Sequence, residues 1–230
     1  MEAENGPRDS PAGHRALEIT GIVAFAALTV GLGLRIWAVV EPSRLWLLLS
    51  AALIGYVAAD LLTGVVHWLF DTWGTEDAPL VGKNFIRPFR EHHDDPLSIT
   101  RHDFVETNGN NCLGTLPVLL AAFFIPAAGR PGFFAAALLL FLSAAVVATN
   151  QFHKWAHTEH PGSVVAALQR CHLILPREHH RLHHMAPFTT HYCITTGWLN
   201  PALRATDAFR RLEKAIRAVT GARPRADEPE

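Results

Sequence analysis

The chain has 230 residues, of which 49% are hydrophobic and only 18% are charged, and its formal net charge is -1. The balanced charge and the lack of a basic block argue against a nucleic-acid-binding protein. Three scattered cysteines without CxxC spacing indicate neither a disulfide framework nor a zinc ribbon. The apolar residues gather in long runs almost free of charge, which is typical of an integral membrane protein.

Four apolar runs follow a polar N-terminal segment. Residues 1–15 carry charges of both signs and two prolines, and they predict a disordered tail without the apolar core of a secretory signal. A helix of roughly 20 apolar residues crosses a hydrocarbon core of ~30 Å. We therefore predict four transmembrane helices, at about residues 17–40, 45–70, 112–128 and 132–152. The last two runs are short, so a single re-entrant hairpin is the alternative to two spans.

Lysine and arginine residues are unevenly distributed between the loops. They are frequent before the first run, between the second and third, and after the fourth, and they are sparse in the other turns. The positive-inside rule then places both termini and the central loop in the cytoplasm. The expected fold is an all-α integral membrane protein with four transmembrane helices and a cytoplasmic helical cap.

The C-terminal part carries apolar residues near helical spacing with basic residues between them. Residues 202–219 therefore predict an amphipathic helix. Such a helix either lies in the membrane surface, with its basic residues toward anionic lipid, or docks on the cytoplasmic cap. Residues 221–230 predict a second tail, which leaves residues 16–220 as a single expected domain.

The 14 histidines are the most unusual feature of the composition. His180, His183 and His184 stand at positions i, i+3 and i+4, which share one face of a helix. Their imidazoles are therefore expected to converge on one point. Neutral imidazole is a favoured ligand of iron, zinc, copper and nickel, so the segment predicts a metal site. A solvated basic helix end is the alternative.

Two other parts of the chain place histidines near a span or in the loop that follows it. His67 lies near the end of the second run, and Asp71 is one helical turn further on the same face. His92 and His93 are adjacent in the next loop. Side chains of adjacent residues on a helix point about 100° apart, so these two either serve two metals or divide between a metal and the substrate.

The fourth run ends with Asn150, His153 and His157 on one helical stripe. Eight histidines are then candidate ligands, which is too many for one tetrahedral zinc ion and enough for two octahedral irons. They are His67, His92, His93, His153, His157, His180, His183 and His184. A metal site at the ends of the spans can activate oxygen beside the membrane, where a lipid chain can reach the metal. A lipid oxidase or desaturase needs this placement.

A few polar residues are candidates for supporting contacts. Asp60 lies inside the second run, where a carboxylate costs ~2.5 to 3.5 kcal/mol on insertion scales. It either orients a ligating imidazole or makes a hydrogen bond between helices. His179 is a further candidate for an outer contact, and His102 is expected at the surface or in the same outer role.

Several blocks of this sequence resemble the plasmanylethanolamine desaturase family, whose bacterial members are the CarF-type carotenoid regulators. The resemblance extends over about residues 60–227. The matching blocks are His67-Trp68 and residues 71–74 (DTWG), 82–83 (GK), 85–93 (FIRPFREHH), 95–96 (DP), 99–104 (ITRHDF), 106–109 (ETNG), 153–155 (HKW), 174–176 (ILP) and 193–200 (CITTGWLN).

This resemblance implies a membrane desaturase that uses iron and dioxygen. The family removes hydrogens from carbons 1 and 2 of the sn-1 O-alkyl chain of an ether phospholipid, which gives the vinyl ether of a plasmalogen. The implied ligands are the eight histidines above together with Asp71. The chain departs from the family where Phe188 stands at a position commonly held by histidine, and His191 is the candidate replacement. In acyl-CoA desaturases a water-bound asparagine stands four residues before a histidine, whereas Asn150 stands three before His153.

The implied cofactors are two iron ions and O2, and each turnover requires two external electrons. The sequence has no GxGxxG motif after a strand, so we expect a separate reductase with a cytochrome b5 or ferredoxin-like carrier. Contact with the lipid phosphate or with this carrier is expected from Lys83, Arg87, Arg90 and Arg101, unless these residues only satisfy the positive-inside rule. The resemblance also implies a bacterial inner membrane and a role in light- or singlet-oxygen-induced carotenogenesis.

Three other functions are compatible with parts of the pattern. A membrane fatty-acyl desaturase or a sterol-type hydroxylase uses the same plan of histidines. A haem-binding electron carrier is a different class, but its histidines should lie within the spans, whereas these lie at their ends. A purely regulatory membrane protein would need no metal.

Overall fold

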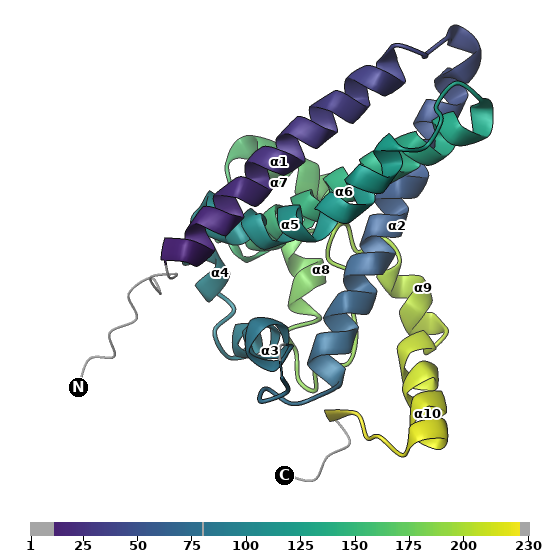
Figure 1. Cartoon of the computed structure of the whole chain (residues 1–230). Coiled ribbons are helices and arrows are strands. Elements are labelled where there is room, and N and C mark those ends of the chain that lie inside the picture. Colours follow the sequence, from purple (N-terminus) through teal and green to yellow (C-terminus); the bar gives the residue numbers. More distant parts are fainter. Residues whose placement is uncertain (1–11, 80, 226–230) are drawn as a thin grey trace. The chain divides into compact units, whose positions relative to one another are not determined.

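The computed structural model describes residues 12–79 and 81–225, and every regular element there is a helix (Figure 1). The α-helices are α1 (Ala12–Trp37), α2 (Leu45–Thr72), α3 (Arg87–Asp94), α4 (Ser98–Arg101), α5 (Phe104–Phe123), α6 (Arg130–His157), α7 (Ser163–Arg170), α8 (Arg177–Arg181), α9 (Asn200–Ala205) and α10 (Ala208–Thr220). A 3₁₀ turn, η1 (Pro42–Arg44), precedes α2, and a π-helical turn, η2 (Gly82–Ile86), precedes α3. The all-α prediction is confirmed for these residues.

The predicted tails lie mostly outside the described residues, which exclude 1–11 and 226–230. Residues 12–15 form the first turn of α1, so the expectation of a tail was wrong there. The described residues divide into two compact units. One unit contains residues up to 59 and residues 100–151, and the other contains 60–99 and residues from 152 onward. The chain passes from one unit to the other within α2, within α4 and again within α6.

In the unit built from α1, α5 and the first parts of α2 and α6, large apolar side chains form the core. Leu32, Leu119 and Phe133 are fully buried there. Helix α1 packs against α5, where the backbone of Gly109 comes so close that a Cβ would lie 2.5 Å from the Glu18 side chain. The small residue therefore fixes the separation of these two helices.

Within residues 12–79 and 81–225, three helices are long and apolar enough to cross a membrane. They extend over Ala12–Trp37, Pro42–Thr72 and Arg130–His157, in agreement with the first, second and fourth predicted spans. The third predicted span differs, because α5 begins at Phe104 with the polar stretch 106–111 and ends at Phe123. Arg35 donates hydrogen bonds to the carbonyls of Phe123 and Ile125, which satisfy the end of that helix.

The remaining unit contains the last turns of α2 and α6 with the short helices α3 and α7 to α10. The predicted single helix over residues 202–219 is divided in two at Asp207, whose φ of 53° is in the left-handed region. Trp68 of α2 donates a 2.9 Å hydrogen bond from Nε1 to Glu213 Oε1, and its ring stacks on Phe209. Glu213 also pairs with Arg210 and is only 2% exposed. These contacts support the docking alternative for α10.

The buried carboxylate of Glu213 generates a stability prediction. Glu213→Ala removes the acceptor of the Trp68 N–H and the buried carboxylate that pairs with Arg210, so the free energy of unfolding in detergent should fall by about 2 to 3 kcal/mol. Glu178→Ala is the matched control, because Glu178 also pairs with an arginine three residues away but both side chains are exposed. It should change stability little. Equal effects of the two substitutions would contradict the importance of the buried contact.

Candidate metal centre

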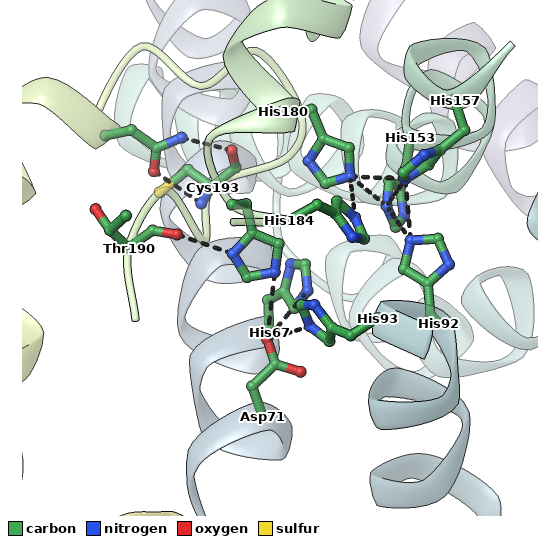
Figure 2. Close-up of polar contacts among 12 residues, drawn as sticks. His67, Asp71, His92, His93, His153, His157, His180, His184, Thr190 and Cys193 are labelled. Atoms are coloured by element: carbon green, nitrogen blue, oxygen red, sulfur yellow. Dashed lines mark hydrogen bonds and ion pairs between the residues drawn. The ribbon is translucent and has the colours of Figure 1, made fainter. Parts of the chain in front are cut away.

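Five imidazoles meet in one place, which we call the first cluster. Its members are His92, His153, His157, His180 and His184. They come from α3, from the end of α6, from α8 and from the turn that follows α8 (Figure 2). Their Nε2 atoms approach one another to between 2.8 and 3.2 Å. The predicted i, i+4 pairing of His153 with His157 is present, and the two nitrogens are 3.2 Å apart.

Hydrogen bonds alone do not account for this first cluster. The Nε2 atom of His153 has three imidazole nitrogens around it, at 3.0, 2.9 and 3.2 Å. A neutral ring nitrogen offers either one hydrogen or one lone pair, so it does not satisfy three partners of its own kind. Donor atoms in neighbouring positions around an octahedral ion at ~2.1 Å lie about 3 Å apart. The spacing in the cluster therefore fits a single bound cation.

Protonation also favours metal binding by the first cluster. Burial, followed by the neighbouring imidazoles, holds the pKa of His92 and of His180 well below the usual value for histidine. The same causes lower the pKa of His184 to about 2. These rings are therefore neutral near pH 7, and each has a nitrogen lone pair available for a metal.

Three more imidazoles surround a carboxylate in what we call the second cluster. The Nε2 atoms of His67, His93 and His183 lie 3.3, 3.2 and 3.4 Å from Asp71 Oδ2. Both carboxylate oxygens and the Nε2 atoms of His93 and His183 are buried without a hydrogen-bond partner. Such atoms are costly unless something binds them, so this donor set also fits a cation. His67 and Asp71 occupy one face of α2, as predicted.

An outer hydrogen bond fixes the orientation of one of these rings. His183 Nδ1 lies 2.8 Å from the carbonyl oxygen of Thr190, to which it can only donate. The tautomer with the proton on Nδ1 leaves the lone pair on Nε2, which faces Asp71. This arrangement of a ligand histidine and a backbone carbonyl is common around protein-bound metals.

Two pairs of adjacent histidines connect the clusters. His92 belongs to the first cluster and His93 to the second, as one of the two alternatives predicted. His184 and His183 divide in the same way. The prediction that His180, His183 and His184 converge on one point was therefore wrong for His183. The reason is local, because α8 ends at Arg181 and the last two histidines lie in a turn where helical spacing does not apply.

Comparison of the sequence with known proteins identifies the family of this chain. Residues 56–227 match the model of the lipid desaturase domain. The chain belongs to the lipid desaturase family. A plasmanylethanolamine desaturase of Myxococcus xanthus is 51% identical to it over 214 residues, which cover 93% of this chain and 76% of the relative. The family resemblance inferred from the histidine blocks is thus confirmed.

Two further relatives of this lipid desaturase come from other organisms. Plasmanylethanolamine desaturase 1 of Mus musculus is 50% identical over 189 residues, which cover 79% of this chain and 69% of the relative. The chloroplastic fatty acid desaturase 4-like 2 of Arabidopsis thaliana is 34% identical over 215 residues, which cover 90% and 71%. No solved structure matches the chain.

Asp60 of this lipid desaturase supports a loop. Its Oδ1 atom accepts hydrogen bonds from the backbone N–H groups of Thr195, Thr196 and Gly197 at 2.8 to 3.1 Å, and its Oδ2 atom accepts one from Leu199 at 3.2 Å. Asp60 therefore makes hydrogen bonds, as one of the two interpretations predicted, but they join α2 to a loop and not to another helix. The loop that it holds follows Thr190, the acceptor of the His183 ring.

The other predicted supporting residues lie outside both clusters. Asn150 donates a 3.0 Å hydrogen bond to the carbonyl of Thr107. His179 contacts the Asn200 side chain at 3.0 Å, and its ring meets that of His191 edge-on. His191 is thus not a member of either cluster. The ring of Phe188, which stands where a histidine was expected, packs against His93 with 4.6 Å between centroids.

Contact of Lys83, Arg87, Arg90 and Arg101 with the lipid phosphate or with the carrier stays a prediction. Arg87 pairs with Glu76 at 3.5 Å, and Arg90 donates to the carbonyl of Gly74 at 2.7 Å. Lys83 and Arg101 line neither of the two cavities described below. The arginines that do line them are Arg204, Arg210 and Arg225. In the sequence, Arg204 and Arg210 are two of several basic residues of an amphipathic helix, and no motif distinguishes them from the others.

The contacts of Asp60 predict a local effect of its substitution. Asp60→Asn removes the negative charge that accepts hydrogen bonds from four backbone N–H groups. The free energy of unfolding should therefore fall by about 2 to 3 kcal/mol. Hydrogen exchange should accelerate at the amides of residues 195–199. Thr63→Val is the matched control on the same helix, because it removes only neutral contacts, at 3.2 Å to the Thr195 hydroxyl and at 3.2 Å to the Asp60 carbonyl. Unchanged exchange in Asp60→Asn would show that the carboxylate does not hold this loop.

Proposed function

We propose that this lipid desaturase acts as a plasmanylethanolamine desaturase. It would introduce a double bond between carbons 1 and 2 of the sn-1 O-alkyl chain of an ether phospholipid, and the product would be a plasmalogen. The main support is that two buried donor clusters occur in a chain 51% and 50% identical to relatives of that name. A role in carotenogenesis stays a prediction from the family resemblance.

We propose further that the metal is iron and that two ions bind. The first cluster would hold one ion through five imidazoles, and the second would hold the other through His67, His93, His183 and Asp71. When bound, a pair of redox-active ions supplies the reduction of dioxygen and the removal of hydrogen from an unactivated C–H bond. Imidazole and carboxylate ligands suit iron, which supports this assignment.

The protein's own contribution is to hold the donors in a fixed orientation and away from bulk water. His67, His180 and His183 are at most 1% exposed, so bulk water has little access to their rings. The Thr190 carbonyl holds the His183 ring in one tautomer, and Phe188 covers one side of the His93 ring. The adjacent pairs His92–His93 and His183–His184 place the two clusters next to each other, as a reaction with two cooperating ions requires.

Three finer points belong to the same proposal. Two electrons per turnover would come from a separate reductase with a cytochrome b5 or ferredoxin-like carrier. Both termini and the metal centre would face the cytoplasm at the bacterial inner membrane, which the distribution of lysine and arginine supports. A fourth span over residues 112–128 would be needed for this topology, and α5 covers only part of that stretch.

A fatty-acyl desaturase is the second candidate function. The relatives named fatty acid desaturase 4 and 4-like in Arabidopsis thaliana are 33 to 35% identical to this chain. The lower identity makes this the weaker candidate. Feeding cells with isotopically labelled lipids separates the two functions. A plasmanylethanolamine desaturase converts the labelled alkyl-ether lipid into a labelled vinyl ether, whereas a fatty-acyl desaturase places a double bond in the labelled acyl lipid.

Elemental analysis tests the proposed metal centre. Purified wild-type protein should contain about two iron atoms per chain. His153→Ala combined with His157→Ala removes two of the five donors of the first cluster, so iron content should fall by about half or more. His160→Ala removes an exposed histidine outside both clusters and should leave it unchanged. A wild-type protein that retains another metal in place of iron would contradict the iron assignment.

Lipid analysis tests the activity itself. Cells that express the wild type and receive a plasmanyl lipid should accumulate vinyl ethers. His183→Ala should lower their formation by about 100-fold or more, because a ligand of the second cluster and its outer hydrogen bond are lost together. His160→Ala serves again as the control, at equal protein level by immunoblot. Equal vinyl-ether content in His183→Ala and wild type would refute the assignment.

A further inference from the structure

Two cavities share part of their lining, and the smaller of them reaches the second cluster. The smaller, of about 140 Å³, is lined by Asp71 and His93 of the cluster itself. The larger, of about 410 Å³, lies between the segment after α8 and helices α9 and α10. Pro187, Thr189 and Arg210 line both. A ligand in the larger cavity is therefore close to one that reaches the second cluster through the smaller.

The larger cavity combines charges of opposite sign with apolar side chains. Arg204 and Arg210 bring positive charge to its wall, and Asp207 brings a carboxylate, while Leu203 and Phe209 are among the apolar lining residues. Among the described residues, the side chains of Arg204 and Asp207 have no hydrogen-bond or ion-pair partner. Both are exposed and available to a ligand that carries both charges.

The break between α9 and α10 brings these charges together. Arg204 and Arg210 are six residues apart, and on one continuous helix their side chains would point about 120° apart. Asp207 interrupts the helix with a φ of 53°, a conformation that aspartate and asparagine adopt more readily than most residues. As a result, residues on both sides of the break line one cavity.

We propose that the larger cavity binds the zwitterionic headgroup of the phospholipid substrate. The phosphate would lie on Arg204 and Arg210, and the ammonium group on Asp207, since guanidinium groups match phosphate oxygens and a carboxylate matches an amine. This inference rests on the proposed function. In the proposed reaction, the new double bond forms next to the ether oxygen, only a few bonds from the glycerol and its phosphate. The headgroup must then lie beside the reacting carbons, as these two cavities allow.

The test measures equilibrium binding without turnover. Full-length protein in detergent is titrated anaerobically, without reductant, in a calorimeter. The probes are a short-chain 1-O-alkyl-2-acyl-glycerophosphoethanolamine, the matching phosphatidic acid without the amine, and the matching alkyl-acyl-glycerol without phosphate. Soluble phosphoethanolamine is a fourth probe, which distinguishes a lipid headgroup from free phosphate. We expect the complete lipid to bind more tightly than soluble phosphoethanolamine.

Arg204→Gln tests the phosphate contact. It should weaken binding of both phosphate-containing lipids about tenfold and leave the phosphate-free lipid unchanged. Arg211→Gln is the matched control, because Arg211 is an exposed arginine on α10 that lines neither cavity. Its binding should equal that of the wild type. If Arg204→Gln binds all probes like the wild type, or loses the phosphate-free lipid equally, the proposal is overturned.

Asp207→Asn tests the ammonium contact and keeps a residue that tolerates the left-handed conformation. It should weaken binding of the ethanolamine lipid about fivefold and leave the phosphatidic acid unchanged or more tightly bound. Asp77→Asn, at a carboxylate that lines neither cavity, is the control. Equal effects on lipids with and without the amine would refute the role of Asp207.

Failure of this proposal is distinguishable from failure of the proposed function. If the wild type forms vinyl ethers but Arg204→Gln retains normal affinity for every probe, only the headgroup site is wrong. If the binding pattern is as expected but no vinyl ether forms with oxygen and electrons supplied, the proposed reaction is wrong while the headgroup site stands. Thermal unfolding of each variant confirms that altered affinity does not reflect loss of the fold.

Discussion

The structure around α8 depends on one constraint, which is that nitrogen lone pairs repel one another unless a cation lies between them. Eight imidazoles and one carboxylate direct their donor atoms at each other in two buried clusters, and several of these atoms have no hydrogen-bond partner. Without an ion this arrangement is unfavourable. Contacts elsewhere must therefore hold the segments in position. The Asp60 carboxylate holds the loop after Thr190, and the Trp68–Glu213 hydrogen bond holds α10 against α2.

Regular helical spacing allowed part of this centre to be predicted from the sequence. His67 with Asp71, and His153 with His157, are four residues apart on long helices, and each pair enters one cluster as expected. His180 and His184 are also four residues apart and share the first cluster, but His183 joins the second. The helix α8 has only five residues. His183 and His184 follow its end, where the direction of a side chain depends on tertiary contacts. No periodicity in the sequence describes these contacts.

Other differences have equally local causes. The third apolar run forms a helix, but polar residues 106–111 occupy its beginning, so α5 is less apolar than the run alone indicated. The C-terminal amphipathic pattern correctly predicted helical structure, yet a single left-handed residue, Asp207, divides it. Phe188 occupies a position where the family resemblance led us to expect a histidine. Its ring packs against that of His93, so an aromatic ring stands where a histidine could have supplied a metal ligand.

The division between α9 and α10 has a consequence for how such enzymes diversify. The donors of the two clusters come from α2, α3, α6 and the region of α8, whereas the charges around the larger cavity come from α9, α10 and the residue between them. If the larger cavity binds the headgroup as proposed, changes in those two helices would alter which lipids are accepted and leave the donors of the two clusters in place.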